Sequence, residues 1–218
     1  MSEQGTVCVT GKGLIRLKPD TMRVMITLEG VESDHAATLA RSASDTERIR
    51  GALSETDFPR DALKTLQFQV QPEYEGYQEK GVYKQKIVGF RFRHELKIEF
   101  PFDNERLGDV FSAIAKAKLS PELSVAYTVK DREAAKNALL GLAVADARAK
   151  AAALTAAAGV KLLSVKHIRY SMNENEFAVR PIAYGGMMRK MSEDSFAPEI
   201  VPEEIEAEDT VSIVWEIE

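Results

Sequence analysis

The glycine pair around Lys12 is the first feature of the chain that could do chemistry. Gly11-Lys12-Gly13 offers the small residues and the lysine of a phosphate-binding loop, but it lacks the longer spacer, the Gly-Lys-Ser/Thr ending and the following helix of that motif. Glycines inside a strand more often mark a bulge or the close approach of another backbone. The spacing therefore predicts a strand irregularity and no cofactor site.

The three histidines do not have the spacing of a metal centre. His35, His94 and His167 fall on separate expected elements, and none has a second histidine or a paired carboxylate at ligand spacing. His94 lies on the apolar face of an alternating strand, which predicts a hydrogen-bonded core residue. His167 stands beside Lys166 and Arg169, where solvent exposure explains it as well as function does. We predict no metal site and no catalytic residue.

Two single residues, Cys8 and Asp20, are further candidates for a chemical role. Cys8 is the only cysteine, so no intramolecular disulfide can form, and a redox role would need exposure and a neighbouring positive charge. A small strand residue is the simpler interpretation. Asp20 could be a lone acid, but beside Pro19 it is better explained as a turn residue.

Aromatic and methionine side chains in polar stretches suggest contact with a partner. Tyrosines alternate with lysines between Glu73 and Lys86, and methionines flank Arg189 and Lys190. Loop tips in solvent would explain both, but exposed aromatic and methionine residues suggest recognition more than solubility. The candidate contact residues are Tyr74, Tyr77, Tyr83, Met187, Met188 and Met191.

A long alanine-rich helix over 131–158 is the element around which these residues must be arranged. Asp131 can cap its first turn, and Gly159 permits the left-handed turn that ends it. Apolar residues recur at steps of three and four from Ala135 to Ala156, which places them on one side. Because most of them are alanines, a sheet or another helix can approach closely.

The other elements have an α+β order. Residues 6–15 and 21–30 read as two antiparallel strands around the Lys18-Pro19-Asp20 turn, and Ser33 or Asp34 caps a helix that ends near Asp57. Strands over 63–74 and 87–100, with 73–86 as the exposed tip of a long hairpin, precede a helix over 105–118 and a strand over 123–129. From residue 21 this order matches the split βαβ pattern of ferredoxin-like units. We predict a mainly antiparallel sheet.

The C-terminal part adds the long helix, strands over 160–170 and 210–217, and a polar loop over 173–209. We predict one domain over 1–218, with two subdomains as its further division. The first, at about 1–130, is the ferredoxin-like core. The second, 131–218, holds the long helix, two strands and the long loop.

Composition limits the class of protein. Of 218 residues, 34 are acidic and 29 basic, which gives a formal net charge of -5 and argues against a nonspecific nucleic-acid binder. No apolar run has the length of a transmembrane helix, and the N-terminus has no basic region followed by an apolar run. The chain as written is expected in the cytoplasm, or in the periplasm if an export signal has been removed.

Several short motifs, in their order, carry a family resemblance. They are Val9-Thr10-Gly11-Lys12-Gly13, Pro19-Asp20, Ile87-Val88-Gly89-Phe90, and Asp146-Ala147-Arg148-Ala149-Lys150-Ala151 in a helix that ends at Gly159. Together, from Gly5 to Glu218, the chain resembles the bacterial SIMPL-domain (YggE-like) family, which is largely of unknown function. The resemblance implies export for many members, a link to oxidative stress, ring-like oligomers and no established catalytic residues.

These observations leave three hypotheses. The first is a non-enzymatic oligomeric scaffold or binding protein, linked to the stress response through the resemblance, in which the hairpin and the 173–209 loop contact other subunits of a homo-oligomer or another protein. The alternative is a small-molecule-binding protein or enzyme with a pocket between sheet and helices that uses Asp20, His94 or His167. The third is nucleic-acid binding, which needs a basic stripe on the surface, and the net charge of -5 does not indicate one.

Overall fold

The computed structural model describes residues 5–79, 81–171, 177–183 and 201–218. The chain forms two compact units, each with its own core. Unit 1 gathers the described residues of Met1–Asp20, Thr128–Val179 and Pro202–Glu218, and unit 2 those of Thr21–Tyr127 and Arg180–Val201. Over these described residues, two mostly antiparallel sheets and three α-helices make this an α+β fold, as predicted.

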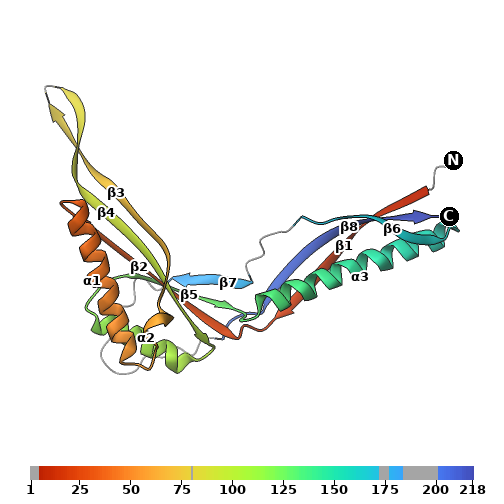
Figure 1. Ribbon diagram of the computed structural model, residues 1–218, viewed down its shortest axis with the longest axis horizontal. Coiled ribbons are helices and arrows are strands. Elements are labelled where there is room, and N and C mark those ends of the chain that lie inside the picture. The colour runs from red at the N-terminus through yellow and green to blue at the C-terminus, as the bar shows by residue number, and fades with distance from the viewer. Residues whose placement is uncertain (1–4, 80, 172–176, 184–200) are drawn as a thin grey trace. The chain divides into compact units, whose positions relative to one another are not determined.

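Unit 2 is built on a five-stranded sheet with the order β3-β4-β2-β5-β7. The first four of these strands have the order of a ferredoxin-like split βαβ unit, so that prediction is confirmed. Figure 1 shows both helices of the unit along one side of the sheet. Its elements are β2 (Thr21–Glu32), α1 (His35–Ser54), a 3-10 turn (Arg60–Ala62), β3 (Lys64–Glu79), β4 (Val82–Pro101), α2 (Asn104–Lys116), β5 (Glu122–Thr128) and β7 (Ala178–Ala183).

The core of unit 2 follows from strand alternation. Every second residue of β2 is buried, from Met22 through Leu28, and the partners of these residues across β4 are the apolar face predicted for that strand. The apolar stripe of α2, with Leu107 and Ile114 fully buried, adds a helical face to the same core. Asp34 caps α1 by accepting the backbone N–H of Ala37 at 2.9 Å.

Unit 1 is a three-stranded sheet covered by the long helix. It contains β1 (Gly5–Leu17), α3 (Arg132–Ala158), β6 (Leu162–Arg169) and β8 (Ile205–Ile217), and the strand order is β1-β8-β6. Asp131 accepts the N–H of Ala134 at 2.8 Å, and Gly159 has a φ of 71° at the C-terminus, so both predicted ends of the helix are confirmed.

Gly11 and Gly13 explain how closely α3 lies on β1. A Cβ atom at Gly11 would stand 2.0 Å from the carbonyl oxygen of Ala143, and one at Gly13 would stand 2.2 Å from that of Leu139. The register of β1 with β8 runs from Gly5 to Leu17 without a bulge. Of the two explanations for the glycine pair, the close approach of another backbone is therefore the one that holds.

Two expectations about the strands need correction. β1 pairs with β8, the last strand, and not with β2, although a turn separates β1 from β2 as expected. Residues 173–209 are not one loop, because β7 occupies Ala178–Ala183 and β8 begins at Ile205. The segment 73–86 is the exposed end of a long hairpin, as predicted, and the strands continue into it: β3 runs to Glu79 and β4 starts at Val82, with a register shift between Glu73 and Tyr74.

None of the helices in the described segments combines the length and the apolar character needed to cross a membrane.

Candidate functional site

The outer part of the β3–β4 ribbon, residues 73–79 and 82–89, extends beyond the end of helix α1 and is called the arm here (Figure 1). The ring of His35, the first residue of α1, packs on Phe90 with 4.3 Å between ring centroids. Phe90 pairs with Pro72. The arm begins with the next pair, Glu73 and Gly89, and its residues therefore lie past the cover that α1 gives to the sheet.

One face of the arm is charged. Residues directly opposite each other in an antiparallel pair share a face. Glu75 lies opposite Lys86 with 3.1 Å between their charged atoms, and Lys84 reaches Glu79 at 2.5 Å. The ammonium group of Lys86 also lies 5.9 Å from the centre of the Tyr77 ring. These four charges are therefore paired within the arm itself, whereas Glu73 at its base pairs with Arg91, just outside the arm, at 2.8 Å.

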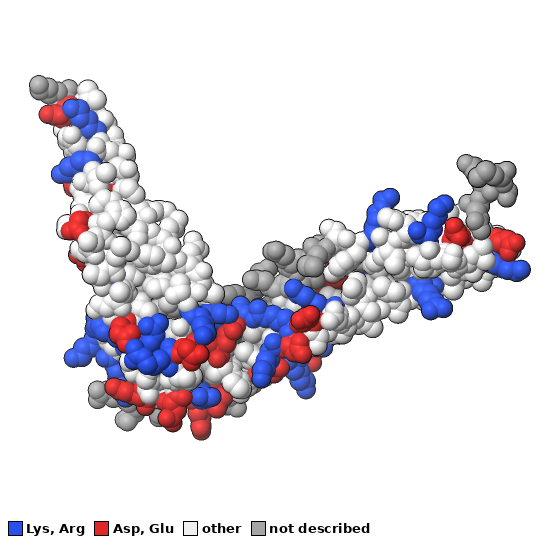
Figure 2. All heavy atoms as spheres, viewed as in Figure 1, with Lys and Arg blue, Asp and Glu red and all other residues white. Residues whose placement is uncertain are grey.

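The other face of the arm carries no charge. It is formed by Tyr74, Gly76 and Gln78 opposite Ile87, Gln85 and Tyr83. Tyr74, Ile87 and Tyr83 are 56%, 55% and 70% exposed. The hydroxyl of Tyr83 lies over Gly76, where a Cβ atom would stand 1.8 Å from it. Figure 2 shows the same division, with Lys, Arg, Asp and Glu along one side of the arm and an uncoloured surface on the other.

The uncharged face continues the face of the sheet that packs on α1. Along β3 the alternation Phe68, Val70, Pro72 leads into Tyr74. Phe68 and Val70 pair with His94 and Phe92 of β4, and His94 contacts α1. The apolar side of the sheet is thus covered by a helix at one end and bare at the other. Large exposed aromatic and aliphatic surface of this kind marks interaction sites.

The sequence-predicted contact residues are only partly brought together. Tyr74 and Tyr83 lie on the uncharged face, whereas Tyr77 lies on the charged one. Met187, Met188 and Met191 lie outside the described residues. Ile87 was missed as a contact residue, although the alternation that carries Tyr83 and Gln85 without a charge continues to it.

His94 forms a polar cluster within unit 2 and is half-buried. Its Nδ1 lies 3.1 Å from the Ser42 hydroxyl and 3.2 Å from that of Thr46, and its Nε2 lies 3.0 Å from that of Thr65. The Thr46 hydroxyl donates to the carbonyl oxygen of Ser42 at 2.8 Å, so in its contact with the ring Thr46 can act only as an acceptor. The hydrogen bonding predicted for His94 is confirmed, and it joins a helix to two strands.

The His94 cluster predicts a pH-dependent stability of unit 2. Burial, and then the positive charge of Arg50, lower the pKa of His94 below its ordinary 6.5. The unfolded chain takes up a proton near that pH and the folded chain does not, so the unfolding free energy is constant above it and falls as the pH falls below it. His94→Gln is therefore expected to lose less unfolding free energy below pH 6.5 than the unsubstituted chain does.

The measurement for this prediction is urea unfolding followed by circular dichroism, on both sides of pH 6.5. His35→Gln serves as the control, because that ring packs on Phe90 and lies outside the His94 cluster. An unchanged pH dependence in His94→Gln would contradict the argument.

The remaining candidate residues lie apart from this cluster. Asp20 accepts the backbone N–H of Lys130 at 2.8 Å, in unit 1. Cys8 is exposed on β1, and His167 lies on β6. Within the described residues, no three or more His, Cys, Asp or Glu side chains are grouped as metal ligands would be. His94 belongs to unit 2, whereas Asp20, Cys8 and His167 belong to unit 1.

Comparison with known proteins identifies a family. The model of the SIMPL family, described as a protein of unknown function (DUF541), matches residues 7–215, nearly the whole chain. No protein of the curated set matches. The match includes all of the described strands and helices except the outermost residues of β1 and β8.

Proposed function

Because the chain belongs to the SIMPL family, whose function is unknown, we propose a function from its surfaces: a non-enzymatic scaffold or binding protein that self-associates through the arm. The single observation that supports this is the bare, uncharged face of Tyr74, Tyr83 and Ile87, which continues the face that α1 covers. The family resemblance adds the stress response as the process in which such an assembly would act.

The arm needs a partner for its own stability. An isolated two-stranded ribbon is marginally stable in water. The exposed ion pairs Glu75–Lys86 and Glu79–Lys84 add little, since such pairs are worth about 0–1 kcal/mol each. Packing of the exposed tyrosines against another apolar surface would stabilise the arm by about 25 cal/mol for each Å² of apolar surface that is buried.

A second copy of this chain fits the uncharged face. Two such faces can meet around a two-fold axis without placing like charges opposite each other, because the face contains only tyrosine, isoleucine, glutamine and glycine. The charged face of the arm remains outside this contact. Its charges are already paired within one chain.

The test uses two pairs of substitutions of the same kind on opposite faces of the arm. Tyr83→Glu with Ile87→Glu places two charges on the uncharged face, and like charges brought together at an interface cost several kcal/mol. The association constant is expected to fall by about two orders of magnitude or more. Solution mass measured by light scattering at several concentrations should then approach the 24.2 kDa of one chain.

The matched control is Tyr77→Glu with Val82→Glu, which makes the same chemical change on the charged face. It should leave the solution mass of the intact chain unchanged. A chain with 75–85 replaced by a tight turn should behave like the first pair. An intact chain that stays monomeric at every concentration, or equal effects of the two pairs, would refute self-association through the arm.

A further inference from the structure

The two outer edges of the three-stranded sheet in unit 1 differ in their protection. On β1, the Asp146 carboxylate accepts the backbone N–H of Lys12 at 2.7 Å, and the Lys150 ammonium donates to the carbonyl oxygen of Thr10 at 3.4 Å. Side chains of α3 thus occupy two of the hydrogen-bonding groups that an added strand would need. Natural sheets protect their edges in this way against unwanted pairing.

The edge of β6 has no such protection among the described residues. β6 pairs with β8 on one side, with register shifts between Leu162 and Val165 and between Val165 and His167. No described side chain bonds to the backbone of its other side. Every second residue of an edge strand directs its N–H and C=O outward. An open edge of this kind is a template for an extended segment.

β6 also carries apolar side chains that the rest of the unit leaves uncovered. Val165 and Ile168 are 48% and 54% exposed, although their partners on β8, Trp215 and Ile213, are buried. The reason is the position of α3, which packs on β1 and β8 and scarcely on β6. An added strand with apolar side chains on this side would extend the core of the unit.

The charge of β6 has one sign. Every ionisable group other than Tyr170 between Val160 and Ser171 is basic or a histidine, and none of the cations Lys161, Lys166 and Arg169 forms an ion pair with a described residue. A second copy of β6 would bring the same positive charges to this edge. An acidic strand would complement them.

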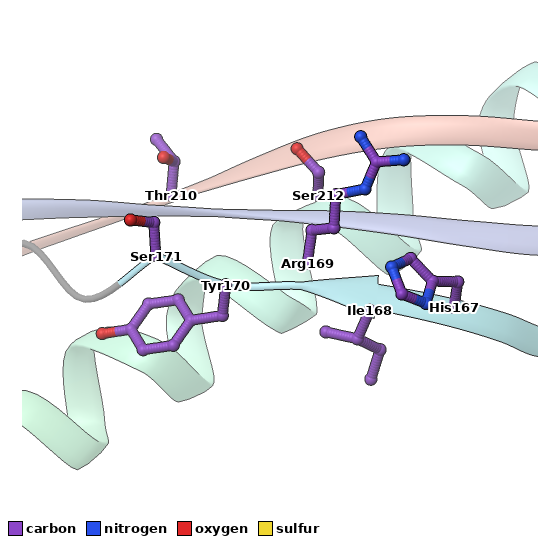
Figure 3. Close-up of a pocket in the computed structure, with 7 residues that line it drawn as sticks. All are labelled: His167, Ile168, Arg169, Tyr170, Ser171, Thr210 and Ser212. Carbon is purple, nitrogen blue, oxygen red and sulfur yellow. The ribbon is translucent and has the colours of Figure 1, made fainter.

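The side of β6 opposite Ile168 is hollowed and polar. Figure 3 shows His167 and Arg169 on this side, with Ile168 and Tyr170 pointing the other way. A hollow of about 570 Å³ lies against this run of β6 and is lined by residues 167–171, Ile168 and Tyr170 included, together with the hydroxyl residues Thr210 and Ser212. Carboxylates projecting from an added strand would meet these cations and hydroxyls.

We infer that the free edge of β6 binds an extended segment of a partner protein in which apolar residues alternate with acidic ones. The segment adds a fourth strand to the sheet. Its apolar residues cover Val165 and Ile168, and its carboxylates lie beside Arg169 and His167. This surface belongs to unit 1 and is separate from the self-association proposed for the arm.

The test measures binding of short labelled peptides to the full chain by fluorescence anisotropy, together with hydrogen exchange of the β6 amides. A peptide that alternates glutamate with valine is expected to bind and to slow exchange over 163–170. A peptide with lysine in place of glutamate should not bind. The glutamate peptide with every second amide N-methylated keeps its side chains but cannot pair with a strand, and it should not bind either.

Charge-reversal variants locate the site. Lys166→Glu with Arg169→Glu is expected to weaken binding of the glutamate peptide by about tenfold or more. Lys136→Glu with Arg148→Glu makes the same change in net charge at exposed positions of α3 and should leave binding unchanged. The peptide titration is repeated on Tyr83→Glu with Ile87→Glu, the variant that weakens the arm contact. This variant should bind the glutamate peptide as the intact chain does, so the two proposals can fail independently.

Three outcomes would overturn the inference. They are the absence of binding by the glutamate peptide, equal binding of the N-methylated peptide, and binding without protection of the β6 amides. Loss of self-association in Lys166→Glu with Arg169→Glu, without peptide binding by the intact chain, would instead assign the edge to a second copy.

Discussion

Replacement of Gly11 by alanine is expected to lower the unfolding free energy of unit 1 by about 3 kcal/mol or more. The added methyl group would stand 2.0 Å from the carbonyl oxygen of Ala143 and 2.5 Å from the backbone nitrogen of Ala147. Both atoms belong to the backbone of α3 and cannot move as a flexible side chain would. The helix must therefore shift away from β1, and the contacts of Ala143 and Ala147 with the sheet weaken.

The measurement is urea unfolding followed by the fluorescence of Trp215, the only tryptophan, which is buried in unit 1 and reports on that unit. Gly141→Ala is the matched control, because nothing lies within 4 Å of a Cβ atom there and the residue is in the middle of α3. It should raise the unfolding free energy by about 0.5–1 kcal/mol. If Gly11→Ala and Gly141→Ala changed the unfolding free energy in the same direction, this account would be wrong.

Phe177→Ala is expected to cost about 3–5 kcal/mol, the range for removal of a buried phenylalanine. The Phe177 side chain is 1% exposed and packs in a cluster with Val129, Ala135, Leu139, Ile205 and Ala207. Its carbonyl oxygen accepts a hydrogen bond from the Thr128 hydroxyl at 2.5 Å. The substitution would leave a cavity between the first turns of α3 and the start of β8.

The same fluorescence measurement checks this value. Leu154→Ala, at an exposed position of α3, is the control and should change the unfolding free energy by less than about 1 kcal/mol. If Phe177→Ala has an effect as small as that of the control, the side chain does not hold the cluster together.

Local signals in the sequence identify most of the helices and the order of the ferredoxin-like unit. Asp131 and Gly159 mark the ends of α3 because capping depends on residues next to each other in the chain. The alternation from Phe90 to Phe100 fixes the inward face of β4 for the same reason. These features can be predicted without knowing which helix or strand lies beside them in the fold.

The partner of β1 could not be predicted in this way. A strand pattern indicates which side chains face a core, but not which strand supplies the neighbouring backbone. The turn at Asp20 favoured pairing with the next strand, whereas β1 pairs with β8, with Val9 opposite Ile213. Gly11 and Gly13 indicated a close approach, and only the structure shows that α3 is the element that approaches.

The acidic run from Glu203 to Asp209 concealed the first half of β8. Ile205 and Ala207 are buried and Glu206 and Glu208 are not, which is strand alternation, but Asp209 is also buried and interrupts the apolar pattern. The Tyr170 hydroxyl donates to Asp209 at 2.8 Å, which accounts for a carboxylate on that side. A buried charge with a distant hydrogen-bond partner is not visible in local spacing. The uncharged face of the arm was likewise hidden, because it depends on register across two strands.

The pairing of the first strand with the last has a consequence for the synthesis of the protein. The ribosome makes β1 first, and the chain from Thr21 to Tyr127, which holds most of unit 2, follows as one continuous segment that can fold as it emerges. β1 must wait for β8, which ends at Ile217. Translation of the whole segment between β1 and β8 therefore precedes the closing of unit 1. Until then, the nascent chain exposes the faces of β1 and α3 that later form its core.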